Sequence, residues 1–255
     1  MSKKNKVGNI VLFNGETIDI AGENFCVIPR KPKQAKLPYS SEEVAEALKV
    51  LTVSMSRIGR WNGHLRIPAK LIKEEGYPVS KSQTFTNGLK IGNVPANRRF
   101  MFYSVMSHAY LVRDIVIRLF KEGDASGRGL SIEALSLQAL LHEIGETVIS
   151  DIPGPLKKLI KGFIKPIENN IEEIMARDLH LYFPWAPLIK QADMLAQDIE
   201  GYYGYDTIVR GVNVSHEFKE EPWMKPALAQ AVMITPESFY STALMSAYKV
   251  GNSRV

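Results

Sequence analysis

The spacing of apolar residues along the chain predicts a mainly helical protein. The clearest stripe recurs every three or four residues and consists of Val44, Leu48, Leu51, Met55 and Ile58. This period is typical of a helix with one buried face. Ser40 or Ser41 is suited to cap the helix, and Gly59 to end it.

Two further segments, 103–120 and 131–150, are apolar on nearly every face. A helix of that composition is expected inside a core, so we predict that both are buried. Weaker patterns predict further helices over 157–180, 188–203, 225–232 and 236–250.

Signals for β-structure are few. Asn14-Gly15 stands between two β-prone runs and predicts a hairpin over 10–20. Residues 65–100 are rich in proline and glycine, which predicts a loop-rich insert with a second small hairpin at Asn87-Gly88. We therefore expect one domain over 1–255. Its core would cover about 41–205, interrupted by the insert at about 65–100 and followed by a C-terminal extension, 206–255.

Composition narrows the choice of partners only slightly. Lys and Arg number 32 against 27 Asp and Glu, and the resulting charge of +5 suits an anionic partner or an ordinary surface. Cys26 is the single cysteine, which excludes an internal disulfide and a thiolate zinc cluster and favours the cytoplasm. The chain shows no secretory h-region and no run of 18 apolar residues, so we expect no membrane association. Without a recognition-helix or aromatic-platform motif, we expect no nucleic-acid binding.

Ionisable residues inside the buried helices are the most informative feature. His108 lies in the first of them, while His142, Glu143 and Glu146 fall on one side of the second. Buried charges must be paired, protonated or bound to metal. Each residue alone is explained more simply as a hydrogen-bonded histidine or an ion-paired glutamate. Their combination favours a metal site.

A fourth ligand is expected from the helix at 188–203. Asp193 lies on the flank of its apolar stripe, whereas Asp198 points towards solvent. Two histidines and two carboxylates form a site suited to a divalent ion of Co, Mn, Zn, Mg or Fe. Glu146 would be close enough to take a proton from a water molecule in such a site.

Four segments, in order, resemble the HD-domain phosphohydrolases. The resemblance is closest to the branch that holds bacterial 5′-deoxynucleotidases and the dATP triphosphohydrolases of phages with 2-aminoadenine DNA. The segments are 57–64 (RIGRWNGH), 103–109 (YSVMSHA), 140–157 (LLHEIGETVISDIPGPLK) and 190–193 (KQAD). The third is the most specific, since it follows the branch's pattern LLHDAxEAxxGDIPxPLK.

The resemblance implies an HD-domain helical bundle, a homo-oligomer and a role for each matched residue. Metal would be held by His108, His142, Glu143 and Asp193, and Glu146 would activate the attacking water. Substrate would be contacted by Arg60 and Lys157 at the phosphates, Trp61 at the base or sugar, and Asp151 at the sugar hydroxyl. His64 fits a phosphate contact or a plain loop residue equally well.

The chain departs from the branch at two points. Glu143 replaces the motif aspartate, which keeps the charge but adds a methylene. Either metal binding survives with altered metal preference, or activity is lost. The second departure is length, because about 38 residues separate the first segment from the second.

These observations leave several functions open. The first is a deoxynucleoside triphosphate triphosphohydrolase that converts dATP to deoxyadenosine and triphosphate. Lys157, Lys158 and Lys161 would hold its phosphate tail, although Lys158 and Lys161 also fit a solvated surface. The second is a 5′-deoxynucleotidase acting on monophosphates. The third is a degenerate HD domain that binds nucleotide without turnover, and other phosphohydrolases, such as an alarmone hydrolase, complete the list.

Overall fold

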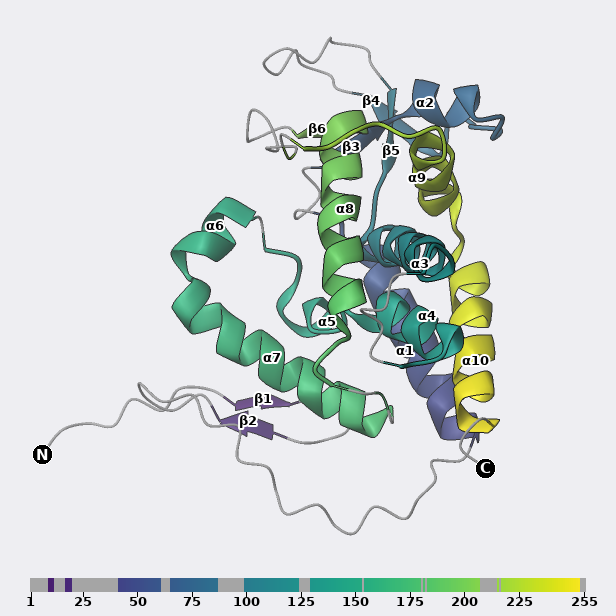
Figure 1. The fold of residues 1–255 in the computed structure, drawn as a ribbon. Coiled ribbons are helices and arrows are strands. Elements are labelled where there is room, and N and C mark those ends of the chain that lie inside the picture. Colours follow the sequence, from purple (N-terminus) through teal and green to yellow (C-terminus); the bar gives the residue numbers. More distant parts are fainter. Residues whose placement is uncertain are drawn as a thin grey trace, which may run out of the picture.

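The protein is mainly helical, as its sequence predicts (Figure 1). The computed structural model describes residues 9–11, 17–19, 41–60, 65–86, 99–123, 129–152, 154–179, 181, 183–206, 215 and 217–252. Structural statements below concern those residues.

The described helices are α1 (Ser41–Arg57), α2 (Ala69–Glu74), α3 (Val105–Lys121), α4 (Ile132–Leu141), α5 (Glu146–Ile149), α6 (Gly154–Leu159), α7 (Lys161–Asp178), α8 (Pro187–Tyr203), α9 (Met224–Met233) and α10 (Pro236–Asn252). The described strands are β1 (Asn9–Val11), β2 (Thr17–Asp19), β3 (Leu65–Pro68), β4 (Thr84–Thr86), β5 (Arg99–Phe102) and β6 (Tyr205–Asp206).

Helix α3 is the centre of the bundle. It packs against α1, α4, α8 and α9, and α10 packs across α1 and α4 (Figure 1). Serine side chains cap both central helices, since Ser104 Oγ accepts the amide of Ser107 and Ser131 Oγ accepts that of Ala134. The buried positions follow one another without a gap over 105–112 in α3 and over 134–141 in α4, which confirms that both are core helices.

The residues after 206 belong to the same core as those before it. Leu228 of α9 and Phe239 of α10 are buried in one cluster with Met55 of α1 and Leu111 of α3. The segments predicted as helices at 225–232 and 236–250 are confirmed as α9 and α10. No helix in the described part of the chain is long and apolar enough to cross a membrane.

The expected loop-rich insert is wrong in part, because much of it is regular structure. β3 lies at the centre of a sheet with the order β4-β5-β3-β6, and α2 follows directly after it. Leu65 and Ile67 of β3 are buried in the core, and so are Leu71 and Ile72 of α2. Elements of three to six residues are too short for a periodic pattern to show, and β6 joins from far along the sequence.

Both predicted hairpins are matched by antiparallel strand pairs. β1 and β2 pair antiparallel with Ile10 opposite Ile18, and the turn between them lies outside the described residues. The small hairpin predicted at Asn87-Gly88 is matched by the antiparallel pairing of β4 with β5, in which Thr86 lies opposite Arg99. Residues 87–98, which join these strands, also lie outside the described residues.

Two helices predicted as continuous are interrupted. The helix expected over 131–150 ends at Leu141, and the chain makes a turn over 142–145 before α5. Within this turn Ile144 N donates to Leu141 O and Glu146 N to Glu143 O, each at 3.0 Å. The helix expected over 157–180 is likewise divided at Ile160 into α6 and α7.

Ser150 ends α5 in a backbone conformation that suits glycine. Its φ of 68° and ψ of 164° fall in a region that residues with a Cβ rarely adopt. The HD-branch pattern has glycine at this position, directly before the aspartate that corresponds to Asp151. The strained residue thus turns the chain so that Asp151 follows as a buried side chain.

Replacing Ser150 by glycine is therefore expected to stabilise the protein. Relief of the strain outweighs the extra flexibility of glycine in the unfolded chain, for a net gain of about 1 kcal/mol in the free energy of unfolding. Urea unfolding followed by circular dichroism measures this gain. Ser150→Ala keeps the Cβ and is expected to give no gain. A loss of stability in Ser150→Gly would contradict the assignment of strain.

Candidate metal centre

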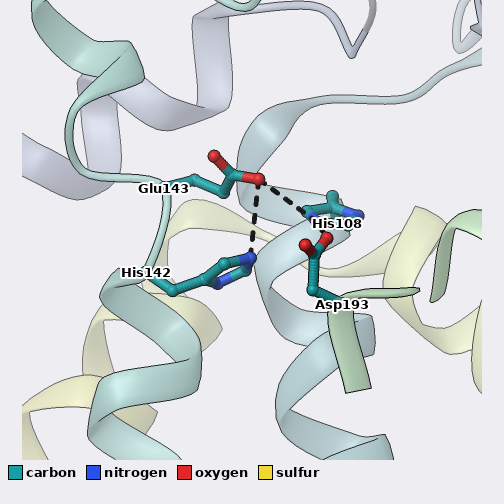
Figure 2. Close-up of side chains that lie close together, drawn as sticks. All are labelled: His108, His142, Glu143 and Asp193. Atoms are coloured by element: carbon teal, nitrogen blue, oxygen red, sulfur yellow. Dashed lines mark ion pairs between the residues drawn. The ribbon is translucent and has the colours of Figure 1, made fainter. Parts of the chain in front are cut away.

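Four side chains with metal-ligating atoms converge from three parts of the chain (Figure 2). His108 projects from α3 and Asp193 from α8, while His142 and Glu143 lie at the end of α4 and in the following turn. One ligand atom from each residue lies within 4.8 Å of those from the others. The structure therefore brings together the four residues that the sequence predicts as ligands.

The spacing of their ligand atoms fits one metal ion. His108 Nε2 lies 3.3 Å from Asp193 Oδ1 and 3.6 Å from Glu143 Oε1, and His142 Nε2 lies 3.5 Å from the same Glu143 oxygen. Metal–ligand bonds of about 2.1 Å at tetrahedral angles separate neighbouring ligand atoms by about 3.4 Å. The added methylene of Glu143 does not keep its carboxylate out of the group.

Both imidazoles are held through Nδ1 so that Nε2 points into the group. His142 Nδ1 donates to the carbonyl oxygen of Ala139 at 2.7 Å, and His108 Nδ1 lies 2.5 Å from Glu200 Oε1. Each Nε2 is buried and has no hydrogen-bond partner among the described residues. Unsatisfied buried nitrogens beside carboxylates are costly unless a cation joins them, so the donor set fits a divalent ion.

The charges around His108 also indicate that this group requires a cation. Burial and the Arg60 guanidinium would lower the pKa of His108, but Glu200 and Asp193 outweigh them and raise that pKa to about 9. A proton on His108 thus supplies positive charge that the surrounding carboxylates require.

Glu146 lies beside the four ligands and is buried. Its Oε1 is 3.8 Å from Arg60 Nη1 and 3.9 Å from Lys157 Nζ, and its Oε2 has no hydrogen-bond partner among the described residues. Burial, and then the negative charge of Glu143, raise the pKa of Glu146 well above its usual range. The raised pKa makes the carboxylate form of Glu146 a stronger base towards a neighbouring proton donor.

Arg60 is buried among carboxylates. Its Nη1 lies 3.4 Å from Asp151, 3.5 Å from Glu143 and 3.8 Å from Glu146, and its Nε lies 3.6 Å from Glu200. Burial would lower the pKa of Arg60, but Asp151 and Glu200 outweigh it and hold the pKa above its usual value. In this structure the guanidinium neutralises carboxylates, and its expected contact with phosphate stays a prediction.

A backbone contact sets the position of Arg60. Its amide donates to Tyr103 O at 2.9 Å, and Val105 N donates to Ile58 O at 2.9 Å, directly before α3. The end of α1 is thereby joined to the start of the helix that carries His108.

A cavity of about 530 Å³ borders the candidate centre. That volume is within the usual range for small-molecule sites. Its lining consists of Arg60, His142, Glu143, Glu146, Asp151, Ile152, Lys157, Lys158, Lys161, Ile164, Lys165, Glu168, Glu172, Trp185, Ile189, Lys190, Asp193 and Gln197.

The cavity has an acidic side and a basic side. The acidic side holds the carboxylates around Arg60, whereas α6 and α7 contribute four lysines between 157 and 165. Lys157 Nζ pairs with Glu168 Oε1 at 2.6 Å. Lys158 and Lys161 have no carboxylate within 4 Å among the described residues, so their charges are available to an anionic ligand.

One wall of the cavity combines an indole with a carboxyl group. Trp185 Nε1 donates to Glu172 Oε2 at 2.9 Å. Burial, with a contribution from Glu143, raises the pKa of Glu172 to about 7 against the opposing charge of Lys165. Glu172 also packs close to Gly145, in the turn that carries Glu143.

The remaining residues predicted for the site differ in where they lie. Asp193 is buried, and Asp198 is partly exposed and accepts the amide of Ser215 at 2.9 Å. Asp151 and Lys157 line the cavity, but their contacts with substrate stay predictions. Trp61 and His64 lie outside the described residues.

Sequence reasoning missed Glu200, Glu168, Glu172 and Trp185. Glu200 follows Asp193 by seven residues, which places both on one side of α8. The signal for Glu200 was its position: an acidic residue on the apolar stripe of a helix, two turns after a proposed ligand. Glu168 and Glu172 are similarly four residues apart on α7.

Comparisons with known proteins add no family. No family model matches the chain, and no curated protein matches it. Among solved structures, the chain is similar to a conserved hypothetical protein from Pyrococcus furiosus at 21% identity, over 67% of this chain and 89% of that one. The TM-score is 0.32, and a likeness at that level supports no conclusion about fold or function.

The raised pKa of Glu172 predicts a pH dependence of stability. The folded protein holds this proton more tightly than the unfolded chain, so the wild type loses stability as pH rises from about 4.5 to about 7. Glu172→Gln cannot titrate and can still accept from Trp185. Its advantage over the wild type should grow across that interval to about 3 kcal/mol and then stay constant.

Urea unfolding at pH 5 and pH 8, with a chelator present, measures this difference. Glu173→Gln changes the exposed neighbour on α7 and serves as the control, with the same stability difference at both pH values. An advantage of Glu172→Gln that does not change with pH would contradict the shifted pKa.

Proposed function

We propose that this protein is a metal-dependent nucleotide phosphohydrolase, and specifically a deoxynucleoside triphosphate triphosphohydrolase with dATP as the favoured substrate. The observation that carries the proposal is the pairing of a candidate metal centre with a lysine-bearing cavity wall. His142, Glu143 and Asp193 line the cavity, His108 completes their group from the buried side, and lysines of α6 and α7 line the same cavity. The preference for dATP comes from the resemblance to the HD branch alone.

The metal would be held by His108, His142, Glu143 and Asp193. When bound, it would polarise a phosphoryl oxygen and lower the pKa of a water molecule. Glu146 lies beside this group and would take the proton of the attacking water. Attack at the α-phosphorus would form a new P–O bond and break the bond to the 5′ oxygen, which would take up a proton in place of the one given to Glu146, releasing deoxyadenosine and triphosphate.

The lysines favour a triphosphate over a monophosphate. Lys157 is held by Glu168 and stands 3.9 Å from Glu146, close to the proposed reaction centre. Lys158 and Lys161 lie further along the same chain segment and have no carboxylate partner among the described residues. Three amines that line the cavity suit a chain of phosphates better than a single phosphate.

The alternative is a 5′-deoxynucleotidase, which would use the same four ligands. A degenerate domain that binds without turnover is the third candidate, and Glu143 in place of aspartate motivates it. Against that, the Glu143 carboxylate lies within 3.6 Å of both histidine Nε2 atoms, so it reaches the group despite its length.

Product analysis tests the proposal. The protein is incubated with dATP and separately with dAMP, in Mg²⁺, Mn²⁺, Co²⁺ or Zn²⁺, and the products are resolved by ion-exchange chromatography. We expect deoxyadenosine and triphosphate from dATP. Phosphate from dAMP alone would establish the nucleotidase instead. Binding without product in every metal would establish the degenerate domain, and Glu143→Asp would then show whether the methylene is the cause.

A double variant, Lys158→Ala/Lys161→Ala, tests the role of the lysine wall. Loss of two partly exposed charge contacts is expected to cost about 1–2 kcal/mol, or roughly a 5- to 30-fold fall in kcat/KM for dATP. Hydrolysis of a deoxynucleoside monophosphate analogue should change much less. Lys70→Ala/Lys73→Ala removes the same charge from α2, away from the cavity lining, and is the matched control. Equal losses in both double variants would contradict a specific role.

A further inference from the structure

A buried carboxylate beneath the candidate metal centre has no role in the predictions from sequence. Glu200 of α8 is 0% exposed, although burial of an ionised carboxyl group costs several kcal/mol unless it is paired. It lies outside the four segments that resemble the HD family. Its position therefore calls for a specific reason.

Three side chains from different parts of the fold surround Glu200. His108 Nδ1 lies 2.5 Å from Oε1, and the Tyr103 hydroxyl donates to the same oxygen at 2.9 Å. Oε2 lies 3.6 Å from Arg60 Nε. The hydrogen bonds and charges of these neighbours hold the pKa of Glu200 below its usual value against the effect of burial.

This contact fixes the state of His108. A carboxylate oxygen can only accept, so the proton of the imidazole must lie on Nδ1, and the lone pair of a neutral ring then lies on Nε2. That Nε2 is 3.3 Å from Asp193 and 3.6 Å from Glu143, where the metal would lie. A charged acceptor at Nδ1 also makes Nε2 a stronger donor to metal.

The two histidines differ in this respect. His142 Nδ1 donates to the backbone carbonyl of Ala139, which is neutral and cannot be changed by substitution at a side chain. His108 alone of the two is backed by a carboxylate. The strength of the metal site therefore depends on Glu200 through His108.

We infer that Glu200 is a positioning residue that sets the metal affinity of the centre by holding His108 in its ligating tautomer and orientation. Tyr103 and Arg60 in turn hold Glu200. The inference rests on the proposed metal centre but not on hydrolysis of any nucleotide, so it stands or fails separately from the proposed reaction.

The test is a titration of the metal-free full chain with Mn²⁺, Co²⁺ and Zn²⁺ in competition with a chromophoric chelator. Glu200→Gln keeps the shape of the side chain and removes its charge. We expect its Kd for metal to rise about 10- to 100-fold, with the stoichiometry kept at one ion per chain. The absorption spectrum of bound Co²⁺ should also change, because the donor strength of His108 is altered.

A matched control separates this effect from a general loss of negative charge. Glu168→Gln neutralises a different buried carboxylate, which lines the cavity and pairs with lysines instead of a histidine. Its Kd for metal should stay within about threefold of the wild type. Equal losses in the two variants would overturn the inference, as would a Kd of Glu200→Gln within twofold of the wild-type value.

A second variant covers the case in which Glu200→Gln does not fold, which circular dichroism of the metal-free protein shows. Glu200→Asp keeps the charge but withdraws it from His108 by about one methylene, and we expect its Kd to rise about tenfold. An unchanged Kd in Glu200→Asp overturns the inference. Wild-type protein that binds none of the three metals overturns it as well, whereas metal binding without nucleotide hydrolysis overturns only the proposed reaction.

Discussion

The centre of this protein holds more buried negative charge than its own cations can balance. Four carboxylates lie around the Arg60 guanidinium, namely Glu143, Glu146, Asp151 and Glu200, and a fifth, Asp193, lies 3.3 Å from His108. Arg60 cannot neutralise all of them, and the buried Nε2 atoms of two histidines face the same group without hydrogen bonds. Such an arrangement is costly in itself. A divalent ion among the ligand atoms would relieve both the charge and the unsatisfied nitrogens.

The fold around this group is arranged to hold it. α3 and α8, packed against each other, carry His108, Asp193 and Glu200, and the pairing of residues 58–60 with 103–105 fixes Arg60 beside them. The turn after Leu141 places His142 and Glu143 in this group, and the strained conformation at Ser150 places Asp151 beside Arg60. Helices α6 and α7 also line the cavity and supply lysines to it. A cluster of ligands that could hold a metal ion, in a cavity that lysines also line, suits a phosphorylated substrate.

Much of this could be predicted from the sequence, and the misses have physical causes. The buried helices and the four candidate ligands were predictable because ionisable residues stood where the apolar pattern demanded burial. The break after Leu141 was not, because the apolar run continues through it and a turn of helix-like geometry leaves the period nearly unchanged. The sheet was missed because its strands are short and β6 joins from a distant part of the chain. Glu200 was missed because its partners, His108 and Tyr103, are brought to it only by the packing of α3 on α8.

Anomalous diffraction from crystals grown with Mn²⁺ or Co²⁺ would locate a bound ion. We expect one strong anomalous peak, about 2.0–2.3 Å from Nε2 of His108 and of His142 and from a carboxylate oxygen of Glu143 and of Asp193. The same peak should be absent from crystals of Asp193→Asn grown at equal metal concentration. A peak at a different place in the chain, or well-ordered crystals in which these four side chains bind no ion, would show that the cluster is not a metal site.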